Sequence, residues 1–214
     1  MKFVFLAFTL IFFLTSCQDL GAFDFPNSYR ITGPIDRKTL INFQKAVKEN
    51  EIKNLILESP GGIIDYSIEI ADLVKSENIN TIVLRNKHCS SACTIIYQAG
   101  KNRYLSRASK FVYHTARLSS YSTKRFFRRC DFPLSENCQK TLSRYMKYLV
   151  QQNERMKQHL EENGLNPQVF NILMEMSKMD IETSYKRGNL YRIPDLMITG
   201  ELLLILNIGT EFTD

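Results

Sequence analysis

Short apolar strands alternate with amphipathic helices between residues 29 and 84, and this alternation limits the possible folds more than any other feature of the sequence. Tyr29 to Ile35, Asn54 to Leu57 and Thr81 to Leu84 have the composition and length of strands. A helix is predicted after Asp36, which can cap it, and a second helix from about Ile63. Strand and helix in this order are typical of right-handed crossovers between parallel strands, so the sequence predicts an α/β fold.

The next segment predicts a buried helix. Ser91 to Gly100 is apolar and nearly uncharged on all sides, and such a helix must be central in a fold. Two short strands are predicted from Arg103 to Leu105 and from Phe111 to His114, and helices from Ser135 to Asn163 and from Pro167 to Met179. The long helix has an apolar stripe that consists of Leu142, Met146, Leu149, Met156 and Leu160. The chain therefore combines a central buried helix with a long C-terminal helical region.

The first residues of the chain predict export. Lys2 is followed by an apolar stretch from Phe3 to Leu14. As a helix, the stretch would span only about 18 Å, well short of the roughly 30 Å core of a bilayer, so it is interpreted as an export signal. The run Leu14-Thr15-Ser16-Cys17 resembles the lipobox of bacterial lipoproteins, in which the cysteine becomes the first mature residue and carries the lipids. An ordinary cleaved signal that happens to end in cysteine is the alternative.

The lipoprotein interpretation divides the chain into three parts. Residues 1–16 are the lipoprotein signal peptide, residues 17–28 a membrane-proximal tether, and residues 29–214 a single domain. Two or more acyl chains on Cys17 would anchor the protein stably in a membrane. Because Gln18 follows the cysteine where an aspartate tends to retain lipoproteins at the inner membrane, the resemblance favours the outer membrane. The expected location is the bacterial cell envelope, with the domain facing the periplasm.

Four further cysteines remain in the mature chain: Cys89, Cys93, Cys130 and Cys138. In an oxidising compartment four cysteines allow three disulfide pairings. Cys130 and Cys138 would close a short loop, and Cys89 and Cys93 lie about 6 Å apart along a helix, within the Cα range that a disulfide tolerates. A zinc site is disfavoured because the sequence contains no pair of cysteines at the closer CxxC spacing. The sequence implies neither a metal nor an organic cofactor.

The charges do not favour a nucleic-acid partner. The chain carries 28 Lys and Arg against 22 Asp and Glu, a net charge of +6. The basic residues are interleaved with acidic ones along most of the chain instead of forming one stripe.

Three features could converge into a site for acyl chemistry. Gly61 and Gly62 follow a strand and precede a helix, so their backbone amides can approach a ligand closely. Ser91 begins the central helix, with the amide of Ala92 beside it, and His114 ends a strand. Strand ends and helix starts share one edge of a parallel layer, so these groups can meet there. Taken singly, each has an ordinary structural explanation as a turn, a cap or a core histidine.

Together, the motifs resemble a known family. Their order and spacing resemble those of the corresponding motifs in the Clp protease proteolytic subunit and its crotonase-fold relatives, above all in the exported Clp-like group. The motifs that carry the resemblance are Ser59-Pro60-Gly61-Gly62, Cys89 to Cys93 continuing to Ala99-Gly100, Arg103-Tyr104, and Phe111 to His114. The resemblance covers Tyr29 to Ala116, with a weaker echo at Leu202 to Glu211. It implies a fold of repeated β-β-α units.

The resemblance also implies roles for single residues. Ser91 is the expected nucleophile and His114 the general base. The amides of Gly62 and Ala92 are the expected oxyanion hole. For the carboxylate that orients the imidazole, Asp195 is the first choice and Asp180 the second, and neither aligns cleanly.

Two functions follow as hypotheses. The first is a membrane-anchored serine hydrolase, a peptidase acting on short or unfolded peptides through an acyl-enzyme. The second is a catalytically inactive crotonase-fold lipoprotein that serves as a binding or assembly module, because a fold can outlive its activity. The expected partners are a peptide or protein substrate, the membrane through the N-terminal lipid, and further copies of the chain in a homo-oligomer.

Overall fold

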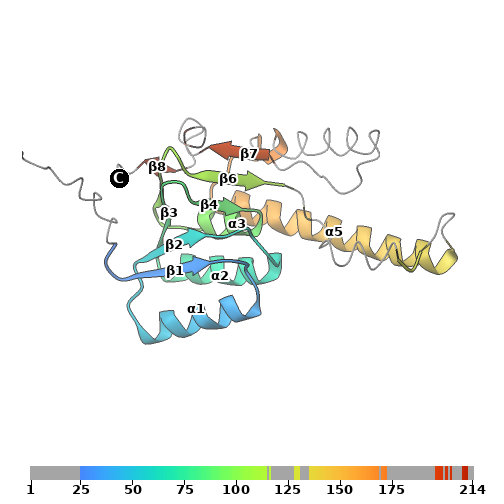
Figure 1. Ribbon diagram of the computed structural model, residues 1–214, viewed down its shortest axis with the longest axis horizontal. Helices are drawn as coiled ribbons and strands as arrows, with labels where there is room; N and C mark the ends of the chain where they lie inside the picture. Colours follow the sequence, from blue (N-terminus) through green and yellow to red (C-terminus); the bar gives the residue numbers. More distant parts are fainter. Residues whose placement is uncertain are drawn as a thin grey trace, which may run out of the picture.

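The computed structural model describes residues 25–114, 116, 128–130, 135–168, 170–172, 196–199, 201, 203 and 209–211. These residues form a mixed α/β fold with two sheets (Figure 1). The strands are β1 (Ser28–Thr32), β2 (Asn54–Glu58), β3 (Asn80–Val83), β4 (His88–Ser90), β5 (Arg103–Leu105), β6 (Lys110–Tyr113), β7 (Leu196–Thr199) and β8 (Thr210–Glu211). The helices with assigned bounds are α1 (Arg37–Glu49), α2 (Ile64–Ser76), α3 (Ala92–Gln98) and α5 (Glu136–Glu162).

The larger sheet has the strand order β1-β2-β3-β5-β8, and all of its neighbouring strands are parallel. The predicted crossovers are therefore confirmed: α1 connects β1 to β2 and α2 connects β2 to β3, both on one side of the sheet in Figure 1. Asp36 caps α1 as predicted, because its carboxylate accepts a hydrogen bond from the amide of Thr39 at 2.9 Å. Four of the five β2 residues are buried, since both faces of a parallel sheet are covered.

The smaller sheet has the order β4-β6-β7, with β4 parallel to β6 and β7 antiparallel to it. The sequence patterns predicted neither β4 nor β7. An isolated bridge between Ser59 and Cys89 joins the end of β2 to β4, through hydrogen bonds of 2.9 Å on both sides of Ser59. This bridge brings the turn after β2 to the end of β4.

Every residue of α3 is buried. Its neighbours include α2, α5, β3, β4 and β6, and the ring of Tyr97 packs against that of Phe111 with centroids 4.8 Å apart. Most of its side chains are apolar, so a helix without a polar face can occupy the interior. The polar Thr94 donates its hydroxyl proton to the carbonyl oxygen of Ser91 at 2.7 Å.

The long helix α5 leaves the body of the fold. Ser135 caps it as predicted, because its hydroxyl accepts from the amide of Cys138 at 3.4 Å. Its 27 residues span about 40 Å, and Figure 1 shows its N-terminal half extending beyond the sheets and the other helices. Met156 and Leu160 near its C-terminal end are buried, whereas Met146 is 54% exposed. Only the C-terminal part of the apolar stripe contributes to the core.

Both expected disulfides are formed, Cys89–Cys93 with a Cα–Cα distance of 5.3 Å and Cys130–Cys138 with 5.8 Å. The reason given for the first pair was wrong, because the two cysteines do not share a helix. Cys89 lies on β4 and Cys93 on α3, so the bridge spans the turn between the two elements.

Several sequence predictions concern residues outside the described ranges. These are the signal peptide at 1–16, Cys17, and most of the tether at 17–28. Within the described ranges, no helix is long and apolar enough to span a membrane. Likewise, among the described residues no three His, Cys, Asp or Glu side chains gather in a way that could hold a metal ion.

Candidate active site

Ser91 occupies a sharp turn between β4 and α3. Its backbone dihedrals are φ 53° and ψ −125°, a conformation that costs a residue with a side chain about 1–3 kcal/mol. A strained strand-to-helix turn of this kind exposes a serine hydroxyl at the end of a sheet, as in the nucleophile elbow of hydrolases. The Ser91 side chain makes no capping hydrogen bond to α3, so its hydroxyl is not used to stabilise the helix.

Gly61 packs directly against this turn. It has φ +93°, and a Cβ atom at this position would lie 2.6 Å from both the Ser90 carbonyl oxygen and the Ser91 Cβ. The backbone amide of Gly61 donates a hydrogen bond to the Ser59 hydroxyl at 3.1 Å, which holds the turn in place. Glycine is therefore required here both by the backbone conformation and by the close approach of the two turns. The Pro-Gly-Gly run was the available sequence signal for this packing role of Gly61, which was not predicted.

The amides proposed as oxyanion donors belong to these two adjoining turns. Gly62 is fixed from one side: Ile35 donates its amide proton to Gly61 and accepts one from Ile63, both at 2.9 Å. The Gly61 carbonyl and the Gly62 amide belong to one trans peptide group and point in opposite directions, so the Gly62 amide faces away from Ile35. The Ala92 amide is in the first turn of α3, where helix geometry supplies no acceptor. Neither amide has an acceptor among the described residues.

His114 directly follows β6, the strand beside β4. The two strands are parallel, with Ser90 paired to Val112, and the amide of Ser91 donates to the Val112 carbonyl oxygen at 2.7 Å. Ser91 and His114 thus leave the carboxyl ends of adjacent strands, which lie about 4.8 Å apart in a sheet. His114 is buried, with 7% of its surface exposed. The structure therefore brings Ser91, His114 and the Gly61-Gly62 turn to one edge of the small sheet.

The carboxylate candidates Asp195 and Asp180 lie outside the described residues. The neighbouring register is described: β7 begins at Leu196, and Leu196 pairs with Tyr113, the residue before His114. Burial raises the pKa of Tyr113 above its ordinary value of 10.0, so this phenol stays neutral near pH 7. Tyr113 therefore cannot supply the negative charge that a general-base histidine needs beside it.

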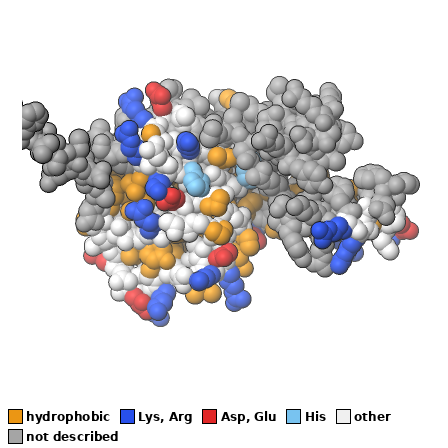
Figure 2. Space-filling model, viewed as in Figure 1, with side chains coloured by type: hydrophobic (Ala, Val, Ile, Leu, Met, Phe, Trp, Pro, Cys, Tyr) orange, Lys and Arg blue, Asp and Glu red, His pale blue; other side chains and the backbone are white. Residues whose placement is uncertain are grey.

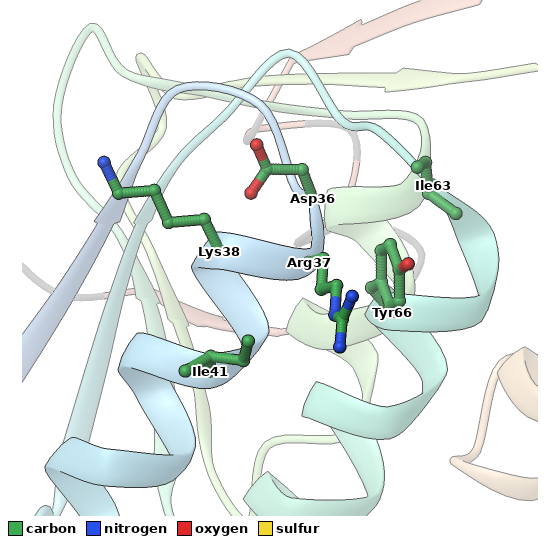
Figure 3. A pocket seen from close by; sticks show the side chains of 6 residues that line it. All are labelled: Asp36, Arg37, Lys38, Ile41, Ile63 and Tyr66. Carbon is green, nitrogen blue, oxygen red and sulfur yellow. The ribbon is translucent and has the colours of Figure 1, made fainter.

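An open pocket of about 580 Å³ lies beside the glycine turn, between the first turns of α1 and α2 (Figure 3). Ile63, the residue after Gly62, forms part of its wall and is 46% exposed. Arg37 and Tyr66 both line the pocket, and in Figure 3 their side chains project into the space between the two helices. The pocket is lined by Asp36, Arg37, Lys38, Ile41, Ile63 and Tyr66, so it combines exposed apolar surface with two cations.

The surface around this pocket is mixed. In Figure 2, which shows the molecule from the same side as Figure 1, hydrophobic side chains gather over the part where α1 and α2 lie. Lys and Arg side chains are spread over the described face and interspersed with Asp and Glu. The Asp36 carboxylate is engaged with Thr39, and that hydrogen bond lowers the pKa of Asp36. Asp36 therefore stays ionised near neutral pH, and the two cations Arg37 and Lys38 outnumber this one carboxylate on the rim.

Comparisons with known proteins support the fold. No family model matches the chain, and a search of curated proteins finds no match. A point mutant of ClpP1 from Listeria monocytogenes is similar in structure, with a TM-score of 0.61 over 88% of this chain and 91% of that one. The fold is Clp protease-like. At 15% sequence identity the likeness concerns the fold alone, and the chemistry has to be argued from the residues of the site.

Proposed function

We propose that this protein is a serine hydrolase, a peptidase that acts on short or unfolded peptides through an acyl-enzyme on Ser91. One observation carries the proposal: Ser91 occupies a strained turn at the end of β4, and His114 directly follows the neighbouring parallel strand β6. Strain of this kind persists only where the surrounding structure enforces it, and it recurs at functional sites. In a serine that serves only as a helix cap, the hydroxyl is hydrogen-bonded to the helix. The Ser91 hydroxyl makes no such bond.

The first chemical step forms the acyl-enzyme. The Ser91 hydroxyl attacks the carbonyl carbon of the scissile amide while the His114 imidazole takes the hydroxyl proton. The tetrahedral intermediate carries its negative charge on the former carbonyl oxygen, which accepts hydrogen bonds from the Gly62 and Ala92 amides. Removing one such donor typically costs about 10² to 10³ in rate. The carbon–nitrogen bond then breaks, and His114 returns the proton to the leaving amine.

The second step releases the product. Water attacks the Ser91 ester, His114 takes a proton from this water, and the Ser91 oxygen leaves and regains a proton from the imidazolium. Because the same oxygen carries the charge in both tetrahedral intermediates, the two amides serve both steps.

Asp195 completes the proposed triad. The antiparallel ladder of β6 and β7 pairs Phe111 with Ile198, Val112 with Met197 and Tyr113 with Leu196. Asp195 directly precedes Leu196 in the sequence, and Leu196 pairs with Tyr113, the residue before His114. This proximity along the chain favours Asp195 over Asp180 as the carboxylate that orients the imidazole.

The cellular setting is also part of the proposal. Acyl chains on Cys17 would hold the enzyme in the bacterial cell envelope, with its catalytic domain facing the periplasm. Copies of the chain would assemble through α5, whose outer half exposes apolar side chains such as Met146 at 54% and Val150 at 57%. Incorporation of radiolabelled palmitate into wild type but not into Cys17→Ser tests the anchor, and size-exclusion chromatography with light scattering tests the assembly.

A fluorophosphonate probe tests the proposed chemistry, because it reacts with an activated serine. We expect the purified, detergent-solubilised full chain to be labelled, and Ser91→Ala to abolish labelling. His114→Ala and Asp195→Asn should lower the labelling rate by about 10³ or more, as loss of a triad member does. A folded wild type that is not labelled would refute the proposal and favour a binding module without catalysis.

A further inference from the structure

A disulfide brackets the proposed nucleophile. Cys89 is the middle residue of β4 and Cys93 is the second residue of α3, so Ser91 lies midway between them in the chain. Both cysteines are fully buried. The bridge therefore fixes the strand that leads into the Ser91 turn to the helix that leads out of it.

The non-covalent contacts of the turn act mainly on its backbone. The Ser91 amide donates to Val112 at 2.7 Å, and Thr94 donates to the Ser91 carbonyl oxygen through its amide at 2.9 Å and its hydroxyl at 2.7 Å. Gly61 fills the space beside the Ser91 Cβ. The helix that follows has only seven residues, and a helix of this length has little stability of its own. A covalent bond across the turn would thus add rigidity that the short helix α3 cannot provide.

We propose that the Cys89–Cys93 disulfide is a positioning element, which holds Ser91 in its left-handed backbone conformation and thereby sets the reactivity of the Ser91 hydroxyl. This inference rests on the proposed hydrolase function. A loop as short as the one between Cys89 and Cys93 restricts the unfolded chain less than a longer loop does. The effect of the bridge is therefore expected on the geometry of the nucleophile more than on the stability of the fold.

The burial of both sulfur atoms distinguishes a permanent constraint from a redox switch. Thiol–disulfide exchange requires that a thiolate reach one of the two sulfur atoms. With Cys89 and Cys93 both at 0% exposure, a reductant reaches the bridge only when the turn opens. The disulfide therefore constrains the active form of the protein continuously.

The chain provides a matched control for the test. Cys130 and Cys138 form the second disulfide, which closes a somewhat longer loop next to the start of α5. Cys89→Ala/Cys93→Ala removes the bridge across the Ser91 turn, and Cys130→Ala/Cys138→Ala removes the other. The measurement is the second-order rate constant of fluorophosphonate labelling, with circular dichroism and the thermal midpoint as measures of folding.

We expect the Cys130/Cys138 variant to be labelled at the wild-type rate and the Cys89/Cys93 variant to be labelled about tenfold to a hundredfold more slowly. A displacement of about 1 Å at a reacting group produces losses of this size. The pH at which the labelling rate is half-maximal should not change, because His114 remains the base. Labelling of the Cys89/Cys93 variant within twofold of wild type would overturn the inference and leave the proposed function intact, whereas an unlabelled wild type would overturn both.

A second measurement covers the case in which the double alanine variant does not fold. In the Cys130→Ala/Cys138→Ala background, the remaining bridge is reduced with a phosphine in denaturant, the chain is refolded, and the free thiols are counted by alkylation and mass spectrometry. The reduced form keeps the sulfur atoms in the core and is expected to label about tenfold more slowly. Reoxidation should restore the original rate, and equal rates before and after reoxidation would contradict the inference.

Discussion

The space beside Gly61 gives the sharpest quantitative test of the two adjoining turns. A Cβ atom at Gly61 would lie 2.6 Å from the Ser90 carbonyl oxygen and from the Ser91 Cβ, and 3.1 Å from the Ala92 amide nitrogen. Ordinary van der Waals contact begins at 3.4 Å, so Gly61→Ala must push the two turns apart by about 1 Å. Gly33 provides the matched control, because it also has a positive φ, +82°, but no atom within 4 Å of its added Cβ.

The two substitutions separate backbone strain from steric overlap. Gly33→Ala introduces only the strain of a left-handed residue, about 1 kcal/mol in the free energy of unfolding after the smaller entropy of the unfolded chain is included. Gly61→Ala adds overpacking of about 1–3 kcal/mol against backbone atoms that cannot rotate away. We therefore expect Gly61→Ala to lower the free energy of unfolding by about 2–4 kcal/mol.

Equilibrium unfolding in urea, followed by circular dichroism, measures this difference. With a slope of about 2 kcal/mol per molar urea, Gly61→Ala should unfold about 1 M earlier than Gly33→Ala. The labelling rate with a fluorophosphonate should fall about a hundredfold in Gly61→Ala and stay unchanged in Gly33→Ala, since only the first displaces Ser91. Equal urea midpoints for the two variants would refute the close packing of the Gly61 turn on Ser91.

Three further predictions concern buried groups. Burial lowers the pKa of His159 below 6.5, although the negative charge of the nearby Asp72 acts in the opposite direction. The contribution of the neutral imidazole to the free energy of unfolding is therefore complete above pH 6.5 and is lost as the pH falls through the folded-state pKa. The urea midpoint should therefore decline less between about pH 7.5 and about pH 5 in His159→Gln than in wild type, and parallel declines would contradict this. Thr81→Val removes the buried hydrogen bond of 2.7 Å to the Tyr97 carbonyl oxygen and should lower the free energy of unfolding by about 1 kcal/mol, whereas an unchanged thermal midpoint would show that the bond contributes nothing. Because burial raises the pKa of Tyr113, wild type and Tyr113→Phe should give the same phenolate absorbance up to about pH 11. A smaller absorbance in Tyr113→Phe would show that Tyr113 ionises in the ordinary pH range.

The elements predicted from the sequence are those whose signals are local. The cap at Asp36, the helices α1 and α2 and the strands β1 to β3 follow from apolar spacing within about a dozen residues, and the structure confirms them. The strand β4, with the sequence His-Cys-Ser, lacks the aromatic and β-branched residues that marked β5 and β6, which are about as short, and β7 was not predicted either. Their existence depends on pairing with β6, which is a contact between distant segments.

The disulfides illustrate the same division. The pairing of Cys89 with Cys93 could be predicted because four residues keep two Cα atoms within reach in more than one conformation. The elements that carry the two cysteines could not be predicted, since the three residues of β4 become a strand only between Ser59 and β6. The position of the bridge across the Ser91 turn is therefore a property of the tertiary structure.

By itself the sequence determined the α/β alternation, the residue types available for acyl chemistry and the glycines that permit a close turn. Only the tertiary structure decided that Ser91 adopts a strained turn against Gly61, and that it leaves the sheet beside His114. It also set the register of β7 against β6, in which Leu196 lies opposite Tyr113. The physical reason is that helix and turn signals act between neighbours in the chain, whereas strand pairing joins residues far apart, and its register depends on the packing of the whole core.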